Sequence, residues 1–126
     1  MQNVFWVGLG GMIGSIARYL VSLAMHAALG SRFPWGTLTV NLIGCAAIGA
    51  FMYAIEDRHQ LPIAMRLFFV VGVLGGFTTF SAFGFETLEL VRKSRLDLAA
   101  GYVAVSVIGG ILAVAAGRAV AESIAR

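Results

Sequence analysis

Charge, cysteine and proline are scarce in this sequence. Of its 126 residues, nine are Lys or Arg and six are Asp or Glu, so 12% are charged, where a soluble domain has about a quarter. The single cysteine, Cys45, excludes a disulfide within the chain and a cysteine metal cluster. The two prolines, Pro34 and Pro62, stand where helices can begin, because a missing N–H is harmless there. The net charge of +3 is scattered, and we expect no nucleic-acid partner.

Hydrophobic residues make up 60% of the chain, and the mean hydropathy is +0.90. This composition predicts an integral membrane protein in contact with lipid. Four apolar segments are separated by short polar connectors, at about residues 4–29, 33–55, 62–91 and 98–117. Each is near the length of about 20 residues that a helix needs to cross about 30 Å of hydrocarbon. We therefore predict an all-α membrane protein in which residues 1–126 form one domain of four transmembrane helices.

The third segment contains the stretch GVLGGFTTFSAF, residues Gly72–Phe83. Glycine is costly inside a helix, and threonine and serine hydroxyls compete for backbone hydrogen bonds. The stretch therefore predicts a transmembrane helix broken near residues 75–79, close to the middle of the membrane. Such a break is tolerated where protein or water covers the freed backbone groups, and broken helices often handle ions and substrates. A glycine-kinked helix packed by core aromatic residues is the alternative.

Basic residues are balanced between the two sides of a four-pass chain. One side carries Arg58, Arg66, Arg118 and Arg126, and the other carries Arg32, Arg92, Lys93 and Arg95. Orientation in the membrane follows the Lys and Arg asymmetry of short loops, and this chain has almost none. The balance predicts insertion in both orientations and an antiparallel, dual-topology homodimer. A single orientation, set by details that counting misses, is the alternative.

Small residues recur at a spacing that brings helices close together. Gly10 and Gly14 form a GxxxG face on the first segment, and Gly72 and Gly76 form another on the third. Without side chains at these positions, the backbones of two helices can touch. The 16 glycines of the chain therefore indicate close helix packing.

Uncharged polar residues lie in two stripes at helical spacing within the apolar segments. Thr37 and Asn41 form one stripe on the second segment, and Tyr102 and Ser106 form the other on the fourth. An unpaired polar group is costly where there is no water, so each of these residues needs a partner. The amide donors of Asn41 could replace water around an anion, and the hydroxyls could donate to one as well. Hydrogen bonds between helices are the alternative.

Two charged residues lie at depth or at the end of a charge-free run. Arg18 lies within the first segment, where it can reach the interface, pair with an acid or attract anions. Glu86 ends the charge-free run that starts at Leu67, and it is a candidate partner for Arg18. The sequence contains no HExxH or GxSxG motif, no phosphate-binding loop and no paired carboxylates inside the segments. We therefore do not expect an enzyme.

Three stretches then occur in order: GGMIGSIARY at Gly10–Tyr19, GTLTVNLIG at Gly36–Gly44 and GVLGGFTTFSAF at Gly72–Phe83. Together they resemble the CrcB/Fluc family of fluoride ion channels. The resemblance covers the first three segments and is compatible with the fourth. It implies a dual-topology homodimer with two pores and passive export of fluoride across the bacterial inner membrane.

The resemblance also implies roles for residues of the second, third and fourth segments. By position, Asn41 would be the pore-lining amide, and Phe80 and Phe83 would be the aromatic pair along the fluoride path. Ser106 and Tyr102 would add polar lining from the fourth segment. Thr37, in the stripe of Asn41, is included among the candidate pore residues.

A structural sodium ion at the dimer interface is implied in the same way. Gly75 and Thr78 would supply backbone carbonyl groups to it. The sequence departs from the family where hydroxyl residues are usual, at Ala82, Gly84 and Gly110. These departures put in doubt a continuous ladder of hydroxyls along the third and fourth segments.

Arg18 and Glu86 resemble the family's first-segment arginine and the acidic residue after its phenylalanine motif.

Two other functions compete with a fluoride channel. A small proton-coupled exporter of cationic compounds, also a four-helix dual-topology dimer, needs a carboxylate in the membrane, and Glu86 is the candidate. Arg18 has the wrong sign for binding cations. A protein that only assembles would explain the glycines, but not Asn41 together with the phenylalanines.

Overall fold

The computed structural model describes residues 1–56 and 61–126, and these ranges are helical apart from short connectors. The helical elements are α1 (Gln2–Leu29), α2 (Trp35–Glu56), α3 (Ile63–Arg66), the π-helix η1 (Leu67–Leu74), α4 (Gly75–Phe77), α5 (Phe80–Arg92) and α6 (Leu96–Ile124). Four stretches are long and apolar enough to cross a membrane: Gln2–Leu29, Trp35–Ile55, Ile63–Arg92 and Leu96–Ile124. The prediction of an all-α fold with four such helices is confirmed.

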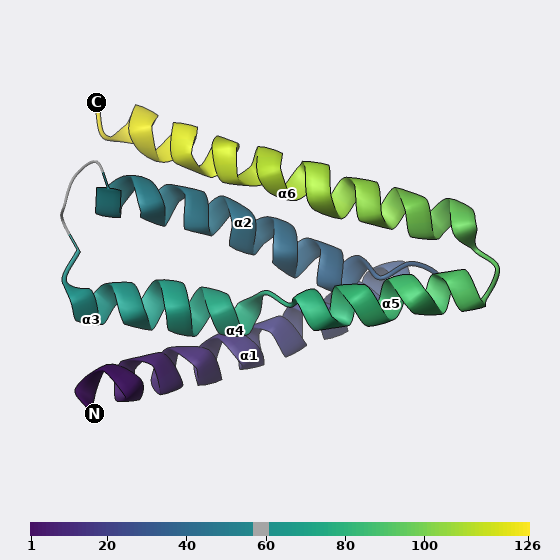
Figure 1. Ribbon diagram of the computed structural model, residues 1–126, viewed down its shortest axis with the longest axis horizontal. Helices are drawn as coiled ribbons and strands as arrows, with labels where there is room; N and C mark the ends of the chain where they lie inside the picture. Colours follow the sequence, from purple (N-terminus) through teal and green to yellow (C-terminus); the bar gives the residue numbers. More distant parts are fainter. Residues whose placement is uncertain (57–60) are drawn as a thin grey trace.

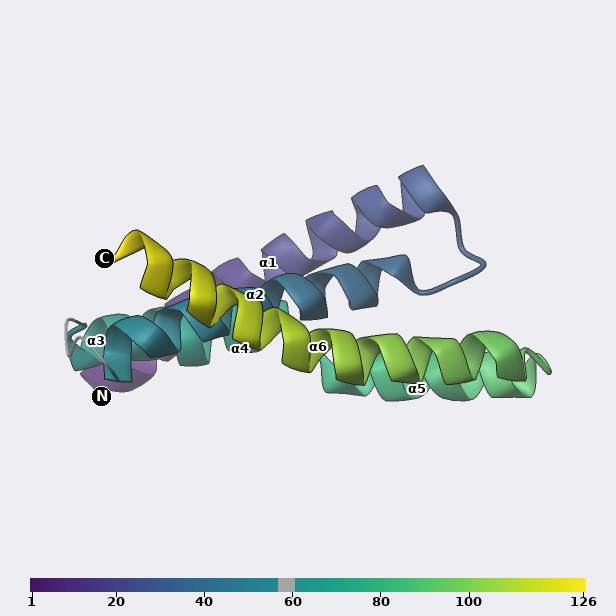
Figure 2. The same cartoon turned by 90° about the horizontal axis from the view of Figure 1, so that it is seen from above.

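Successive long stretches run in opposite directions along the long axis of the molecule (Figure 1). Both chain termini lie at the end where α3 begins, and the turn between α5 and α6 lies at the opposite end. The second and fourth stretches, α2 and α6, lie along each other, while α1 packs against η1 and α4. Figure 2 shows that α1 leans away from α5 and α6 towards the end where α1 finishes.

Local chemistry explains where several helices begin and end. Gly30 has a φ of 77°, which favours glycine, and its N–H donates to the His26 carbonyl at 2.9 Å, so α1 ends there. Pro62 precedes α3, where its missing N–H is harmless. Ser94 has a φ of 59° in the tight turn between α5 and α6. These turns fold the chain back on itself and set the alternation of the four stretches.

Glycines let α1 lie directly on η1. A Cβ atom at Gly14 would collide with the carbonyl oxygen of Val73, and one at Gly72 would lie 2.9 Å from the Gly10 Cα. Side chains at these positions would push the two helices apart. The predicted small-residue faces are therefore confirmed as the contact between the first and third stretches.

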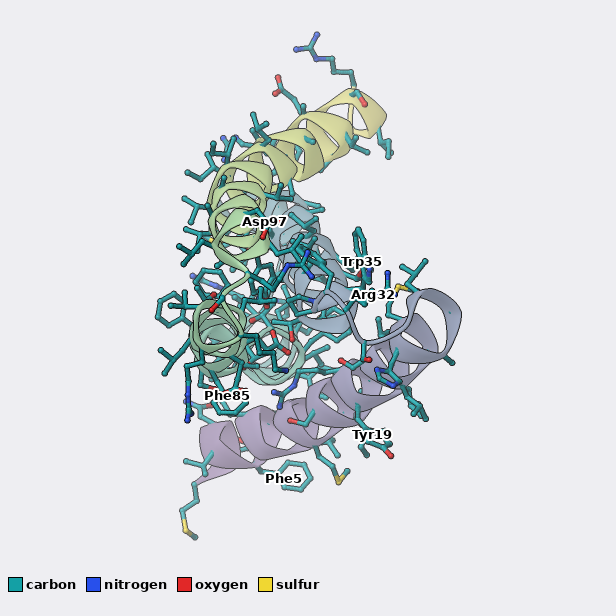
Figure 3. The ribbon with its side chains drawn as sticks, turned by 90° about the vertical axis from the view of Figure 1, so that its right-hand side faces the viewer. Phe5, Tyr19, Arg32, Trp35, Phe85 and Asp97 are labelled. Atoms are coloured by element: carbon teal, nitrogen blue, oxygen red, sulfur yellow. The ribbon has the colours of Figure 1, made fainter. Side chains whose placement is uncertain are left out.

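The buried core is small and the apolar outer surface is large. One cluster of this core consists of Leu38, Leu90, Ala99 and Tyr102, with Phe33, Leu42, Phe83 and Leu98 packed around it. On α6, Ile108 is 60% exposed, Ile111 66% and Leu112 62%, and Phe5 and Tyr19 point outward from α1 in Figure 3. A patch of this kind is unfavourable in water and indicates contact with lipid or another chain. The protein is thus a multi-pass membrane protein.

Candidate functional site

The helical backbone of the third stretch stops at Phe77 and resumes at Phe80 (Figure 1). Thr78 (φ −85°, ψ 158°) and Thr79 (φ −152°, ψ 120°) are extended. Gly75, by contrast, is helical and begins α4. The low helix propensity of the glycines drew attention to this stretch, but the non-helical backbone lies at the two threonines that follow them.

The side chain of Asn41 on α2 is bonded to the backbone of Thr79 in both directions. Its Oδ1 accepts the Thr79 N–H at 2.8 Å, and its Nδ2 donates to the Thr79 carbonyl oxygen at 3.0 Å. A carboxamide can accept and donate at once. The Asn41 side chain therefore makes the two backbone hydrogen bonds of the extended residue Thr79 that its neighbours in a helix would make. Sequence reasoning offered Asn41 as an anion donor or as an interhelical hydrogen bond, and the interhelical bond is present.

The hydroxyl of Thr79 caps the start of α5. Its Oγ1 accepts the Ala82 N–H at 3.2 Å and lies 3.3 Å from the Ser81 Oγ. Threonine at this position satisfies a backbone donor that the first turn of a helix leaves without a carbonyl partner. The neighbouring hydroxyl, on Thr78, donates instead to the Leu74 carbonyl oxygen at 2.9 Å. Side chains and backbone therefore share the hydrogen bonds at the interruption.

A groove of about 390 Å³ opens beside the interruption. Six of the residues singled out from the sequence line it: Asn41, Gly75, Thr78, Phe80, Phe83 and Ser106. Most of the remaining lining is apolar, from residues of α2, η1 and α6, and it includes the thiol-bearing Cys45. The groove therefore places one amide, three hydroxyl-bearing residues (Thr78, Thr79 and Ser106) and two aromatic rings on a largely apolar wall.

The hydroxyl of Ser106 stands out among the polar groups of this site. Its Oγ is buried and has no hydrogen-bond partner among the described residues. Buried polar side-chain atoms nearly always have a partner, and leaving one unmade costs about 1–3 kcal/mol. A polar ligand or water in the groove would remove this cost.

The rings of Phe80 and Phe83 lie next to each other on α5. Their centroids are 5.6 Å apart at an interplanar angle of 42°. Phe83 also lies 5.2 Å from the ring of Tyr102 on α6, whereas the side of Phe80 away from the core is open, since the residue is 83% exposed. One ring is therefore anchored to the core, and the other is left at the rim of the groove.

Tyr102 and Thr37 meet Glu86 outside the groove. The two carboxylate oxygens of Glu86 accept the Tyr102 and Thr37 hydroxyls, each at 2.8 Å. In the described part of the chain no ion pair joins Arg18 to Glu86, which corrects the candidate pairing. The four-pass topology could have indicated the contacts of Glu86 with Thr37 and Tyr102, because it brings the starts of α2 and α6 level with α5.

A second, larger cavity of about 990 Å³ lies at that end, between the end of α1 and α5. Thr37 and Glu86 lie on its wall, and the cationic residues Arg32, Lys93 and Arg95 contribute to its lining. Tyr102 is fully buried between Glu86 and Phe83, so it lies between the cavity and the groove.

The positions that depart from the family pattern also lie along the third and fourth stretches. Ala82 contributes its backbone N–H to the Thr79 hydroxyl. A Cβ atom at Gly110 would lie 3.5 Å from the Cys45 Sγ, and one at Gly84 would meet nothing within 4 Å. Of the polar residues predicted on α6, Ser106 is the one that lines the groove.

Four long apolar helices and a groove with convergent polar groups define a multi-pass membrane protein of the transport class. The sequence profile described as CrcB-like protein, Camphor Resistance (CrcB), matches residues 5–118. The chain belongs to this family, and the resemblance seen in its three motifs is confirmed.

Several relatives carry the name fluoride-specific ion channel FluC. The protein of Agrobacterium fabrum is 44% identical over 124 residues, covering 98% of this chain and 99% of the relative. That of Magnetococcus marinus is 47% identical over 98 residues, covering 78% and 80%. That of Nitrobacter winogradskyi is 44% identical over 111 residues, covering 88% of each.

Proposed function

We propose that the protein is a fluoride-selective channel through which cytoplasmic fluoride leaves passively, down its electrochemical gradient. The observation that carries the proposal is the groove, which is lined by the Asn41 amide, two phenylalanine rings and the Ser106 hydroxyl, the last without a partner among the described residues. Membership of the family and the FluC names of the relatives support the same function. A channel is not an enzyme, and the proposal assigns no catalytic residue.

Fluoride is small and tightly hydrated, so a pore must replace its water with strong donors. The Asn41 Nδ2 carries a second hydrogen besides the one given to Thr79, and Ser106 adds a hydroxyl. Phenylalanine rings are positive at their edges, so Phe80 and Phe83 can present edges to an anion. These contacts are weak enough individually for the ion to leave again, as conduction requires.

The path begins in this proposal at the larger cavity, whose lining carries three cationic side chains against two carboxylates, Glu86 and Glu89, and so favours anions. Arg18, half-buried on α1, adds positive potential. Beyond the cavity, the hydroxyls of Thr37 and Tyr102 lie at Glu86, and the Tyr102 ring leads to Phe83 and the groove. Both of these hydroxyls donate to Glu86, so fluoride exchanges water for the ring edges, the Ser106 hydroxyl and the Asn41 amide that lie beyond them.

A second copy of the chain in the opposite orientation would complete the protein. In such an antiparallel homodimer each chain has its interruption near the middle of the membrane, and the two interruptions meet at a two-fold axis. The open side of Phe80 and the balanced basic residues support this arrangement.

The backbone at the interruption suits a structural sodium ion, which would join the two copies and would not be transported. Carbonyl oxygens are the donors that a hard cation prefers. Gly75 and Thr78 line the groove and would supply these oxygens, and Thr78 is in an extended conformation that turns its backbone out of a regular helix.

In this proposal the channel lies in the bacterial inner membrane. Hydrogen fluoride is neutral and crosses lipid, then dissociates in a less acidic cytosol. A passive channel lets the trapped anion return down its gradient, so the cell needs no energy source for export.

The deciding experiment is efflux from liposomes that contain the purified protein. Liposomes loaded with potassium fluoride or potassium chloride are treated with valinomycin, and anion release is followed with ion-selective electrodes. We expect fast release of fluoride and almost none of chloride. Equal release of both anions would contradict fluoride selectivity, and transport that requires a proton gradient would favour the proton-coupled exporter.

A further inference from the structure

The hydrogen bonds at the interruption have a specific effect on two carbonyl groups. In a continuous α-helix each N–H donates to the carbonyl oxygen four residues earlier. The Thr79 N–H would then bond to Gly75, and the Ala82 N–H would bond to Thr78. In this protein the first donates to the Asn41 Oδ1 at 2.8 Å, and the second donates to the Thr79 Oγ1 at 3.2 Å.

We propose that the side chains of Asn41 and Thr79 are positioning residues that divert these two donors, and so leave the carbonyl oxygens of Gly75 and Thr78 available to a cation. This inference rests on the proposed function, which includes the structural sodium ion. Neither side chain is a ligand of the ion in this account. Each acts by accepting a backbone hydrogen that would otherwise occupy a carbonyl oxygen.

Both carbonyls lose their ladder donors to side chains of the chain itself. The Asn41 Oδ1 accepts the Thr79 N–H, and the Thr79 Oγ1 accepts the Ala82 N–H. Gly75 and Thr78 also line the groove, whose wall is largely apolar, so an oxygen left there gains from a cation.

The diversion also joins the anion site to the cation site. The Asn41 side chain lines the groove with Ser106. Its Oδ1 accepts the Thr79 N–H, which would donate to the Gly75 oxygen in a continuous helix. Binding of a cation therefore stabilises the same backbone conformation that orients the Asn41 amide.

Sodium binding to the purified protein tests the role of the Thr79 hydroxyl. The protein is transferred into sodium-free N-methylglucamine buffer and titrated with sodium chloride in a calorimeter. We expect Thr79→Val to weaken sodium binding by about tenfold or more, because the Ala82 N–H can return to the Thr78 oxygen. Thr79→Ser keeps the acceptor and should bind within about twofold of the unaltered protein.

Thr87→Val is the matched control. The Thr87 hydroxyl lies on the same helix and donates to the Phe83 carbonyl oxygen at 2.7 Å, away from the interruption. The same loss of a hydroxyl there should leave sodium binding unchanged. If Thr79→Val binds sodium as tightly as Thr87→Val, the inference is wrong.

A second measurement needs no variant. The pair Thr78–Thr79 is the one Thr-Thr step in the sequence, so a protein labelled with ¹³C-carbonyl and ¹⁵N threonine reports on the Thr78 carbonyl alone. We expect its ¹³C shift to change on addition of sodium. An unchanged shift in a protein that binds sodium overturns the inference, even if Thr79→Val does not fold. An unaltered protein that releases no fluoride would instead contradict the proposed function.

Discussion

At the scale of single residues, Asn41 has a structural task and, in the proposed channel, a chemical one as well. Its oxygen accepts from Thr79 and its nitrogen donates to the same residue, which only a carboxamide of this length can do here. The amide hydrogen that remains is thereby held in one direction. An anion site built on this donor is ordered before the ion arrives, which lowers the cost of binding.

Asn41→Asp should nearly abolish fluoride efflux while the protein still assembles. A carboxylate cannot donate to the Thr79 carbonyl oxygen, and its charge repels an anion, so we expect a loss of about a hundredfold or more. Efflux from liposomes and elution volume in detergent are the measurements. Asn3→Asp makes the same change at the exposed start of α1 and should leave efflux intact. Normal efflux through the Asn41 variant would remove this residue from the path.

Phe80→Ile tests whether the ring edge or only the apolar bulk matters. Isoleucine fills much of the same space without the positive rim of an aromatic ring, so fluoride efflux should fall by about tenfold. Phe5→Ile on α1 is the control, because Phe5 is 62% exposed and lies outside the groove. If both variants conduct equally well, a ring-edge contact is not part of the mechanism.

Sequence reasoning at this scale predicted which residues converge but not all of their partners. Asn41, the phenylalanines and Ser106 were found because polar groups in an apolar segment need a reason to be there. The hydroxyl partners of Glu86 were missed, since they depend on the distances between three helices. A charge pattern suggested Arg18 as the partner, but it contains no information about which side chains reach the carboxylate.

At the scale of elements, the third stretch shows how packing modifies propensity. Gly72 and Gly76 remain helical, within η1 and α4, where they lie directly on α1. Thr79 is extended where the Asn41 side chain bonds to its backbone. The existence of the four helices follows from the length of the apolar segments. The π-helix Leu67–Leu74 has no comparable signal in the sequence.

Gly14→Ala should weaken the contact between α1 and η1. A Cβ atom there would collide with the Val73 carbonyl oxygen, which belongs to backbone and cannot turn aside. We expect a loss of about 1–3 kcal/mol in the free energy of unfolding, seen as a lower midpoint in thermal unfolding of the purified protein. Gly8→Ala, on the same helix, meets nothing within 4 Å and should show no such loss. Equal midpoints would mean that α1 and η1 can separate without cost.

At the scale of the whole molecule, the proposed homodimer rests on the groove and on the distribution of basic residues. Phe80 is 83% exposed beside a largely apolar groove that also holds the Asn41 amide and the Ser106 hydroxyl, and these polar groups would be unfavourable against lipid. A second copy that covers this side would satisfy both features. Apart from Arg18, which lies within the first segment, the basic residues are equally divided between the ends of the helices, so their number favours neither orientation.

Reporters fused to the C-terminus should therefore give signals on both sides of the membrane. Alkaline phosphatase is active only outside the cytoplasm and a fluorescent protein of the usual kind only inside, so each fusion should be active in the same strain.

Ser31→Lys adds a positive charge to the connector between α1 and α2, opposite the termini. It should retain that connector in the cytoplasm, raise the phosphatase signal and lower the fluorescence. If the unaltered chain gives a signal on one side only, or if the added lysine leaves the ratio unchanged, charge balance does not set its orientation, and the antiparallel dimer loses its physical basis.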